Sequence, residues 1–150
     1  MTIEALLNLT DGRLQNTPSI QAIEGATVYP SKVEYGDLFI SSNQDEIDIA
    51  IGRGAYAIIY DDESINITDS DTAWIMVHSI EEASFKLLRY VILEKEASFY
   101  YISEHENSFL KMILLQKSNI GFISNEWRKA FEQILNSPQK LFVGTNKELM

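Results

Sequence analysis

The chain has 150 residues, 45% of them hydrophobic and 23% charged, which predicts a globular protein of one domain or two small units. Its formal net charge of −10 argues against nucleic acid and anionic membranes as partners, because both are bound through clustered Lys and Arg. The absence of cysteine excludes disulfides, thiol catalysis and cysteine-ligated metals. The N-terminus lacks a basic leader and no apolar run has membrane-spanning length, so we expect a cytoplasmic protein.

Short helices and strands alternate through the first half of the chain. Helices are expected at residues 2–9 and 43–53, and strands at residues 26–29, 37–41, 56–60, 64–68 and 73–77. From Ser79 onward apolar residues recur at helical spacing, and Ser79 with Glu82 forms a capping-box pattern. A long helix therefore follows the strand-rich first half.

The second half alternates strand and helix regularly. Strands are expected at residues 98–102, 119–123 and 140–144, and helices at residues 104–116 and 125–135. This order predicts a small parallel sheet with right-handed crossovers. We therefore expect an α/β protein of two units, with the first in residues 1–78, and a connecting helix plus a small parallel unit in residues 79–150.

Three stretches resemble the N-terminal domain of the Mur ligases in order and spacing. They are LNLTDGRL, SKVEYGDLFIS and AIGRGAYAIIY, and the D-alanyl-D-alanine-adding member is the most similar. The family motif D-S-R-x-V-x-x-G-D-L-F is matched at Val33, Gly36, Asp37, Leu38 and Phe39, and a later G-A pair at Gly54 and Ala55. The resemblance covers Thr2 to Tyr60. It implies that residues 1–78 form a mixed sheet with helices that binds UDP-N-acetylmuramoyl-peptide during peptidoglycan precursor synthesis. It also implies that residues 79–150 resemble a truncated ATPase domain.

The chain departs from this family where the family holds its nucleotide sugar. The D-S-R triplet falls on Tyr29-Pro30-Ser31, and the D-G-H loop expected after the G-D-L-F strand is missing. A weakened nucleotide-sugar site would then use the remaining polar residues, with Lys32 as a point charge for a diphosphate. These residues are Ser31, Lys32, Ser41, Ser42 and Asn43. Alternatively, the last three only cap the following helix, as Ser and Asn commonly do.

A second departure concerns the phosphate loop that opens the next unit of the family. In its place stand Ser103, Glu104, His105, Glu106 and Asn107, with no glycine for close backbone approach and no lysine for phosphate. Ser103 and Glu106 form a capping-box pattern, and two glutamates at the helix start would repel a triphosphate. We therefore expect a degenerate phosphate loop and no bound ATP. The length of the chain also leaves no room for the family's full ATPase and C-terminal domains.

Two further groups of residues allow a functional and an ordinary interpretation. His78 and His105 would bind zinc only if they converged with carboxylates, and otherwise they are a strand-end and a surface residue. Paired carboxylates among Asp61, Asp62, Glu63, Asp69 and Asp71 would hold Mg²⁺ or act as general acid and base, but acidic turns around a strand have the same pattern. We expect no metal and no cofactor.

These observations favour a non-catalytic Mur-ligase-like module that binds a UDP-N-acetylmuramoyl-peptide or a protein of the same metabolism. The alternative is a structural or interaction protein that has lost its ligand; a third hypothesis is part of a split ATP-dependent ligase. Aromatic side chains crowd the second half, so some must be exposed unless a homodimer or another protein covers them.

Overall fold

The computed structural model describes residues 1–114 and 119–150. It divides into two compact units, Met1–Ser84 and Phe85–Met150. The division falls inside helix α3, which spans Ile80–Glu94. Among the described residues, no helix has the length and apolarity needed to cross a membrane.

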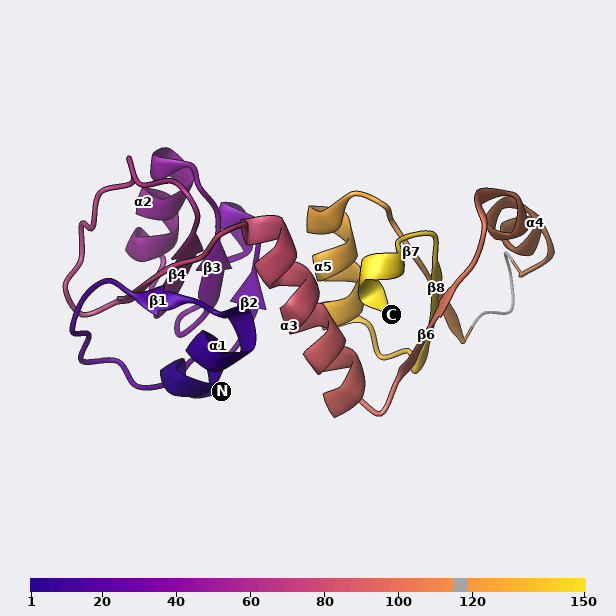
Figure 1. Cartoon of the computed structure of the whole chain (residues 1–150), viewed down its shortest axis with the longest axis horizontal. Helices are drawn as coiled ribbons and strands as arrows, with labels where there is room; N and C mark the ends of the chain where they lie inside the picture. The colour runs from indigo at the N-terminus through magenta and orange to yellow at the C-terminus, as the bar shows by residue number, and fades with distance from the viewer. Residues whose placement is uncertain (115–118) are drawn as a thin grey trace. The chain divides into compact units, whose positions relative to one another are not determined.

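The first unit contains a five-stranded mixed sheet with the order β1-β5-β4-β3-β2 (Figure 1). Strands β2 to β5 are parallel, and β1 pairs antiparallel with β5. The strands are β1 (Arg13–Leu14), β2 (Ala26–Thr27), β3 (Leu38–Ile40), β4 (Ala57–Tyr60) and β5 (Ala73–Met76). Every residue of β3 and β4 is buried, which explains their uninterrupted apolar sequences. The expected mixed sheet is confirmed.

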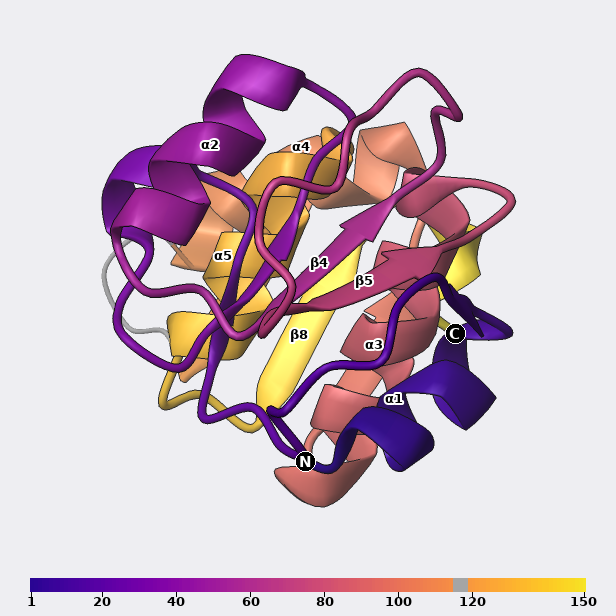
Figure 2. The same ribbon diagram turned by 90° about the vertical axis from the view of Figure 1, so that its left-hand side faces the viewer.

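Helices α1 (Ile3–Thr10) and α2 (Gln44–Gly52) lie on opposite faces of this sheet (Figure 2). Each begins at a residue whose side-chain oxygen accepts a backbone amide, Thr2 from Ala5 and Asn43 from Glu46. The inner face of α2 packs on one side of the sheet in a core that includes Ile47, Ala50, Phe39, Ile58 and Trp74. Each face of the sheet is therefore covered by one of these two helices.

The strand expected at residues 64–68 does not form. Side chains take the backbone groups that a strand would pair: Asp62 Oδ1 accepts the amide of Ser64 at 2.8 Å. The side-chain amide of Gln44 binds both backbone groups of Asn66. Its Oε1 accepts the Asn66 amide at 2.7 Å, and its Nε2 donates to the Asn66 carbonyl at 3.3 Å. This segment is therefore irregular chain held to α2, and the prediction was wrong.

The second unit is built on a three-stranded parallel sheet with the order β6-β8-β7. The parallel unit expected from the sequence is confirmed. Residues 115 and 116, the last two of the expected helix 104–116, lie outside the described residues. Figure 1 shows α5 on one side of this sheet and α4 on the other. The elements are β6 (Ser98–Tyr101), α4 (Glu104–Leu114), β7 (Ile120–Ile123), α5 (Trp127–Asn136), β8 (Leu141–Gly144) and the 3-10 helix η2 (Lys147–Leu149).

One lysine closes the C-terminal end of α5. Lys95 Nζ donates to the carbonyl oxygens of Ile134, Leu135 and Ser137 at 2.6, 2.8 and 3.0 Å. These carbonyls are among those that a helix end leaves without intrahelical partners. A cation there also complements the helix dipole. Lys95 thus holds the end of α3 to the end of α5 within the second unit.

Candidate functional site

The G-D-L-F stretch forms a tight turn at the amino end of β3. The amide of Asp37 donates to the carbonyl of Glu34 at 3.2 Å, and Gly36 at the third position has φ +96°. This is the pattern of a type II turn, which favours glycine there. The Asp37 carboxylate turns back and accepts the Glu34 amide at 2.9 Å. The Asp of this motif is therefore used to hold the turn.

The G-A pair supports the same turn from the end of α2. Gly54, with φ +97°, accepts the amide of Gly36 at 2.9 Å through its carbonyl. A Cβ on Gly54 would lie 2.6 Å from the ring of Tyr35. Gly36 and Gly54 therefore both belong to one tightly packed corner, formed by the turn before β3 and the end of α2, in which both residues have positive φ. This corner lies at the amino ends of the strands, away from the edge where polar loops gather.

Polar loops gather at the carboxyl edge of the first sheet, because β2 to β5 run in the same direction. The loop after β3 carries Ser41, Ser42 and Asn43. Ser41 Oγ donates to Glu46 Oε2 at 2.6 Å, and Asn43 Oδ1 accepts the amide of Glu46 at 3.1 Å. The structure therefore brings these residues together with α2, each with an intramolecular hydrogen bond.

Ser42 joins the loops after β3 and β4 through two hydrogen bonds to one residue. Its Oγ donates to Asp61 Oδ1 at 2.5 Å and accepts the amide of Asp61 at 2.9 Å. The second carboxylate oxygen of Asp61 accepts the amide of Ile80 at 2.9 Å. Asp61 thus links two strand ends to the first turn of α3.

The remaining two residues of the expected sugar site lie in the loop after β2. Ser31 and Lys32 are exposed in the 3-10 helix η1 (Pro30–Lys32). The Lys32 ammonium lies 5.2 Å from the ring centroid of Tyr29. Because β2 is the neighbour of β3 in the sheet, the loops after these two strands share one edge of the sheet.

A hollow of about 340 Å³ opens at the same edge, beside the ends of β4 and β5. Arg13 reaches this place because β1 runs antiparallel to β5 and pairs with Met76. The hollow combines three carboxylates with one arginine and one histidine, which makes it a poor match for a diphosphate. Its lining consists of Asp11, Arg13, Asp61, Glu63, Met76, Val77 and His78.

Two of the acidic residues in the stretch 61–71, Asp62 and Asp69, accept backbone amides two or three residues further on. Asp69 Oδ1 accepts the amides of Asp71 and Thr72 at 2.7 and 3.3 Å. Hydrogen bonds from Ser64 lower the pKa of Asp62. Within the described ranges, no group of three or more His, Asp and Glu side chains is arranged to hold a metal ion. The hydrogen bonds of Asp62 and Asp69 agree with the interpretation of these two carboxylates as turn formers.

In the second unit, Ser103 to Asn107 open α4 at the carboxyl end of β6. Ser103 Oγ accepts the amide of Glu106 at 3.1 Å, and it donates to Glu106 Oε1 at 2.9 Å. The Glu106 carboxylate therefore binds the Ser103 hydroxyl, whereas a full capping box would place it on the Ser103 amide. Glu104 Oε1 accepts from Asn125 Nδ2 at 3.0 Å, and His105 is exposed.

No family model and no curated protein matches the chain. Solved structures do. A MurF from Acinetobacter baumannii is similar over 95% of this chain and 34% of its own, with a TM-score of 0.63 and 14% identity. MurF ligase from Thermotoga maritima in complex with ADP is similar over 81% of this chain and 31% of its own, with a TM-score of 0.58 and 18% identity. The chain has a Mur-ligase-like fold, and it spans about a third of the length of these ligases.

Sequence reasoning missed the hollow at the ends of β4 and β5. Asp11 and Arg13 lie in the LNLTDGRL stretch, where only a helix end was expected. Arg13 and Leu14 form a strand of two exposed residues with no periodic signal. The hollow arises only when β1 pairs with β5, and local sequence carries no sign of that pairing.

Proposed function

We propose that this chain is a non-catalytic module with a Mur-ligase-like fold, which binds a UDP-N-acetylmuramoyl-peptide and does not use ATP. The observation that carries the proposal is the internal cap at the start of α4. Backbone amides at a helix start bind phosphate when they are available. Here Ser103 takes the Glu106 amide, and the carboxylates of Glu104 and Glu106 add negative charge at the same place.

The ligand side of the proposal rests on the loops after β2 and β3. They share the carboxyl edge of a parallel sheet, where ligands of open α/β folds commonly bind. The hollow near β4 and β5 is acidic and would repel a diphosphate. Lys32, in the loop after β2, supplies a positive charge at the same edge of the sheet. We therefore assign the diphosphate to the β2 side, with Ser31 and Lys32 as its contacts.

A thermal-shift titration tests this proposal. UDP-N-acetylmuramoyl-tripeptide at a hundred times its dissociation constant stabilises by about 2.7 kcal/mol, which raises the melting temperature by several degrees. We expect that shift, and none with ATP·Mg²⁺. Lys32→Ala should reduce the shift and Lys147→Ala, in η2, should leave it unchanged. No shift with the muramoyl compound would overturn the ligand assignment.

A structural or interaction protein without a ligand is the second candidate. The observation in its favour is that Ser41, Ser42 and Asn43 all make hydrogen bonds within the chain. A ligand would have to compete with these contacts. This candidate expects no response to any nucleotide sugar and a function carried by a protein surface.

A further inference from the structure

We infer that β7 is an open sheet edge through which the second unit pairs with a second copy of this chain. The two β7 strands would run antiparallel about a two-fold axis and join two three-stranded sheets into one of six strands. This inference is independent of the proposed function, because it concerns only residues 85–150.

Strand β7 differs from the other edge strands among the described residues. Each edge of the first sheet is a strand of only two residues, β1 or β2. In the second sheet, η2 lies against β6. Strand β7 has four residues and partly exposes its first three, and among residues 1–114 and 119–150 it pairs only with β8. Short or covered edges are the usual protection against strand addition, and within those residues β7 has neither.

The sequence of β7 also carries none of the residues that block pairing. It reads Ile-Gly-Phe-Ile, without charge or proline. Two copies placed antiparallel would therefore set no like charges opposite each other. The absence of proline leaves every backbone amide able to donate.

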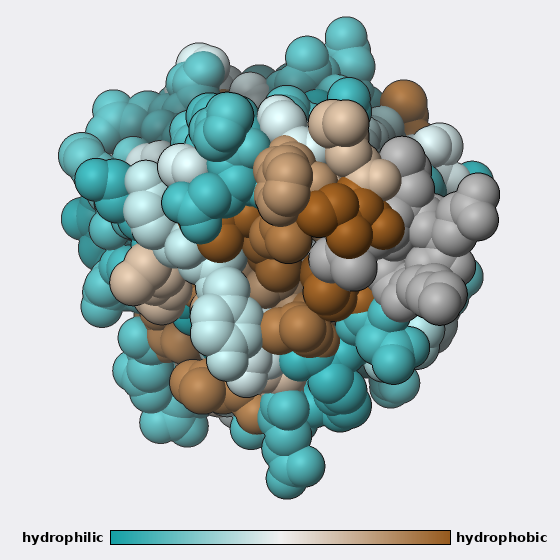
Figure 3. Space-filling model, turned by 90° about the vertical axis from the view of Figure 1, so that its right-hand side faces the viewer, coloured by the Kyte–Doolittle hydropathy of each residue, from teal (hydrophilic) through white to brown (hydrophobic). Residues whose placement is uncertain are grey.

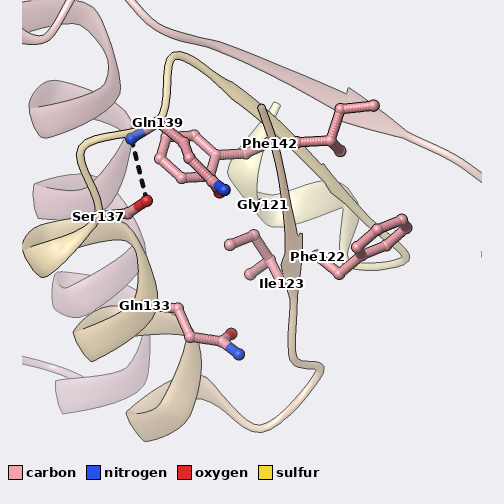
Figure 4. A pocket seen from close by; sticks show the side chains of 8 residues that line it. Gly121, Phe122, Ile123, Gln133, Ser137, Gln139 and Phe142 are labelled. Carbon is pink, nitrogen blue, oxygen red and sulfur yellow. Dashed lines mark hydrogen bonds between the residues drawn. The ribbon is translucent and has the colours of Figure 1, made fainter. Parts of the chain in front are cut away.

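A hollow of about 290 Å³ runs beside β7 on the α5 side (Figure 4). Gln133, Ser137 and Gln139 lie along it, and all four residues of β7 line it. A Cβ on Gly121 would lie 2.6 Å from Gln139 Oε1 and 2.7 Å from Phe142, so this glycine lets the strand lie close to them. Space next to a strand edge admits side chains of an added strand.

Charge favours the second unit over the first as the place where two copies meet. The first unit has three Lys and Arg against fifteen Asp and Glu, a formal net charge of −12. The second unit has nine against seven, a net charge of +2. An interface between two second units therefore has little like-charge repulsion, whereas an interface between two first units would have much more.

The main competing surface is an apolar patch on α4. Figure 3 shows apolar side chains gathered on this face of the molecule. Phe109, Met112 and Ile113 are 59, 77 and 60% exposed. Nothing in the structure indicates what covers this patch, whereas the β7 edge is self-complementary. Tyr100, 58% exposed on β6, marks the opposite sheet edge and provides a control.

Sedimentation velocity over about 10 µM to about 1 mM tests the inference, since an interface this short is expected to be weak. We expect a monomer–dimer equilibrium. Ile120→Lys puts a charge on the β7 edge and should raise the dimer dissociation constant at least about tenfold, while Tyr100→Lys leaves it unchanged. In the wild-type protein, hydrogen exchange of the β7 amides should slow as protein concentration rises.

A monomer at every concentration would overturn the inference. So would a dimer that Tyr100→Lys dissociates and Ile120→Lys does not. Circular dichroism melting of both variants identifies a loss of fold, and the hydrogen-exchange result in the wild type holds even if Ile120→Lys fails to fold.

Discussion

Ser42 and Asp61 are joined by two hydrogen bonds, from the serine hydroxyl to the carboxylate at 2.5 Å and from the aspartate amide to the serine oxygen at 2.9 Å. They bring together the ends of β3 and β4, where a ligand of this fold would be expected. The same aspartate accepts the first amide of α3. The polar groups at this edge therefore stabilise the fold, whatever else they bind.

Ser42→Ala should lower the free energy of unfolding by about 1–3 kcal/mol, because it leaves the Asp61 carboxylate and amide without their serine partner. Urea unfolding at neutral pH measures the loss. Ser31→Ala, at an exposed position in η1, is the matched control and should change stability by less than about 0.5 kcal/mol. Equal stability of the two variants would show that the hydrogen bonds between Ser42 and Asp61 contribute nothing to stability.

Gly54→Ala should destabilise the protein by at least about 1–2 kcal/mol, the cost of a left-handed conformation for a residue with a Cβ. The contact of the new Cβ with Tyr35 adds to this cost. Gly52→Ala is the control, since Gly52 is the last residue of α2 and a Cβ there meets nothing within 4 Å. That variant should be unchanged or more stable by up to about 1 kcal/mol. If both variants unfold alike in urea, the packed corner at Gly36 and Gly54 is not needed.

Lys95→Met should lower the stability of the second unit by about 1–3 kcal/mol, because it removes charge-assisted hydrogen bonds to the three carbonyls at the end of α5. Lys129→Met, an exposed lysine near the start of the same helix, should have little effect. Hydrogen exchange in α5 localises the change. Unaltered protection of α5 in Lys95→Met would contradict this role.

Stability should fall above about pH 10, and Tyr60 should account for part of the fall. Burial raises the pKa of Tyr60 above its usual value, so the unfolded chain ionises first. The neutral Tyr60 ring therefore makes its full contribution to the free energy of unfolding below about pH 10. That contribution is lost as the pH rises through the pKa of Tyr60 in the folded protein. Urea unfolding at pH 8 and pH 11 should show a smaller alkaline loss in Tyr60→Phe than in the wild type. An identical loss would contradict this explanation.

Sequence patterns located the long helix and the buried strands because those elements depend on local signals. The helix from Ser79 has apolar residues at helical spacing, and Ser79 Oγ accepts the Glu82 amide at 3.2 Å as its pattern predicted. The strand expected at residues 64–68 failed because Gln44, twenty-two positions away from Asn66, takes the backbone groups of that residue. Hydrogen bonds between residues so far apart in the sequence leave no periodic pattern from which they could be predicted.

The candidate site was harder to predict than the fold for the same reason. The polar residues after β3 were identified from position and type, and the cap of α2 that Asn43 forms with Glu46 is local in sequence. The Ser42–Asp61 pair, by contrast, depends on how two strand ends meet. The hollow lined by Arg13 and His78 depends on the pairing of β1 with β5. The serine cap at the start of α4 could be predicted from the sequence, because Ser103 and Glu106 are only three residues apart.

Calorimetric titration of the full chain with ATP·Mg²⁺, together with a phosphate-release assay, tests the central claim most directly. The internal cap at Ser103 and Glu106 predicts no binding with a dissociation constant below about 1 mM, a free energy of about −4.1 kcal/mol, and no hydrolysis. Saturable binding at micromolar ATP, or release of phosphate above the protein-free rate, would contradict the account of a non-catalytic module.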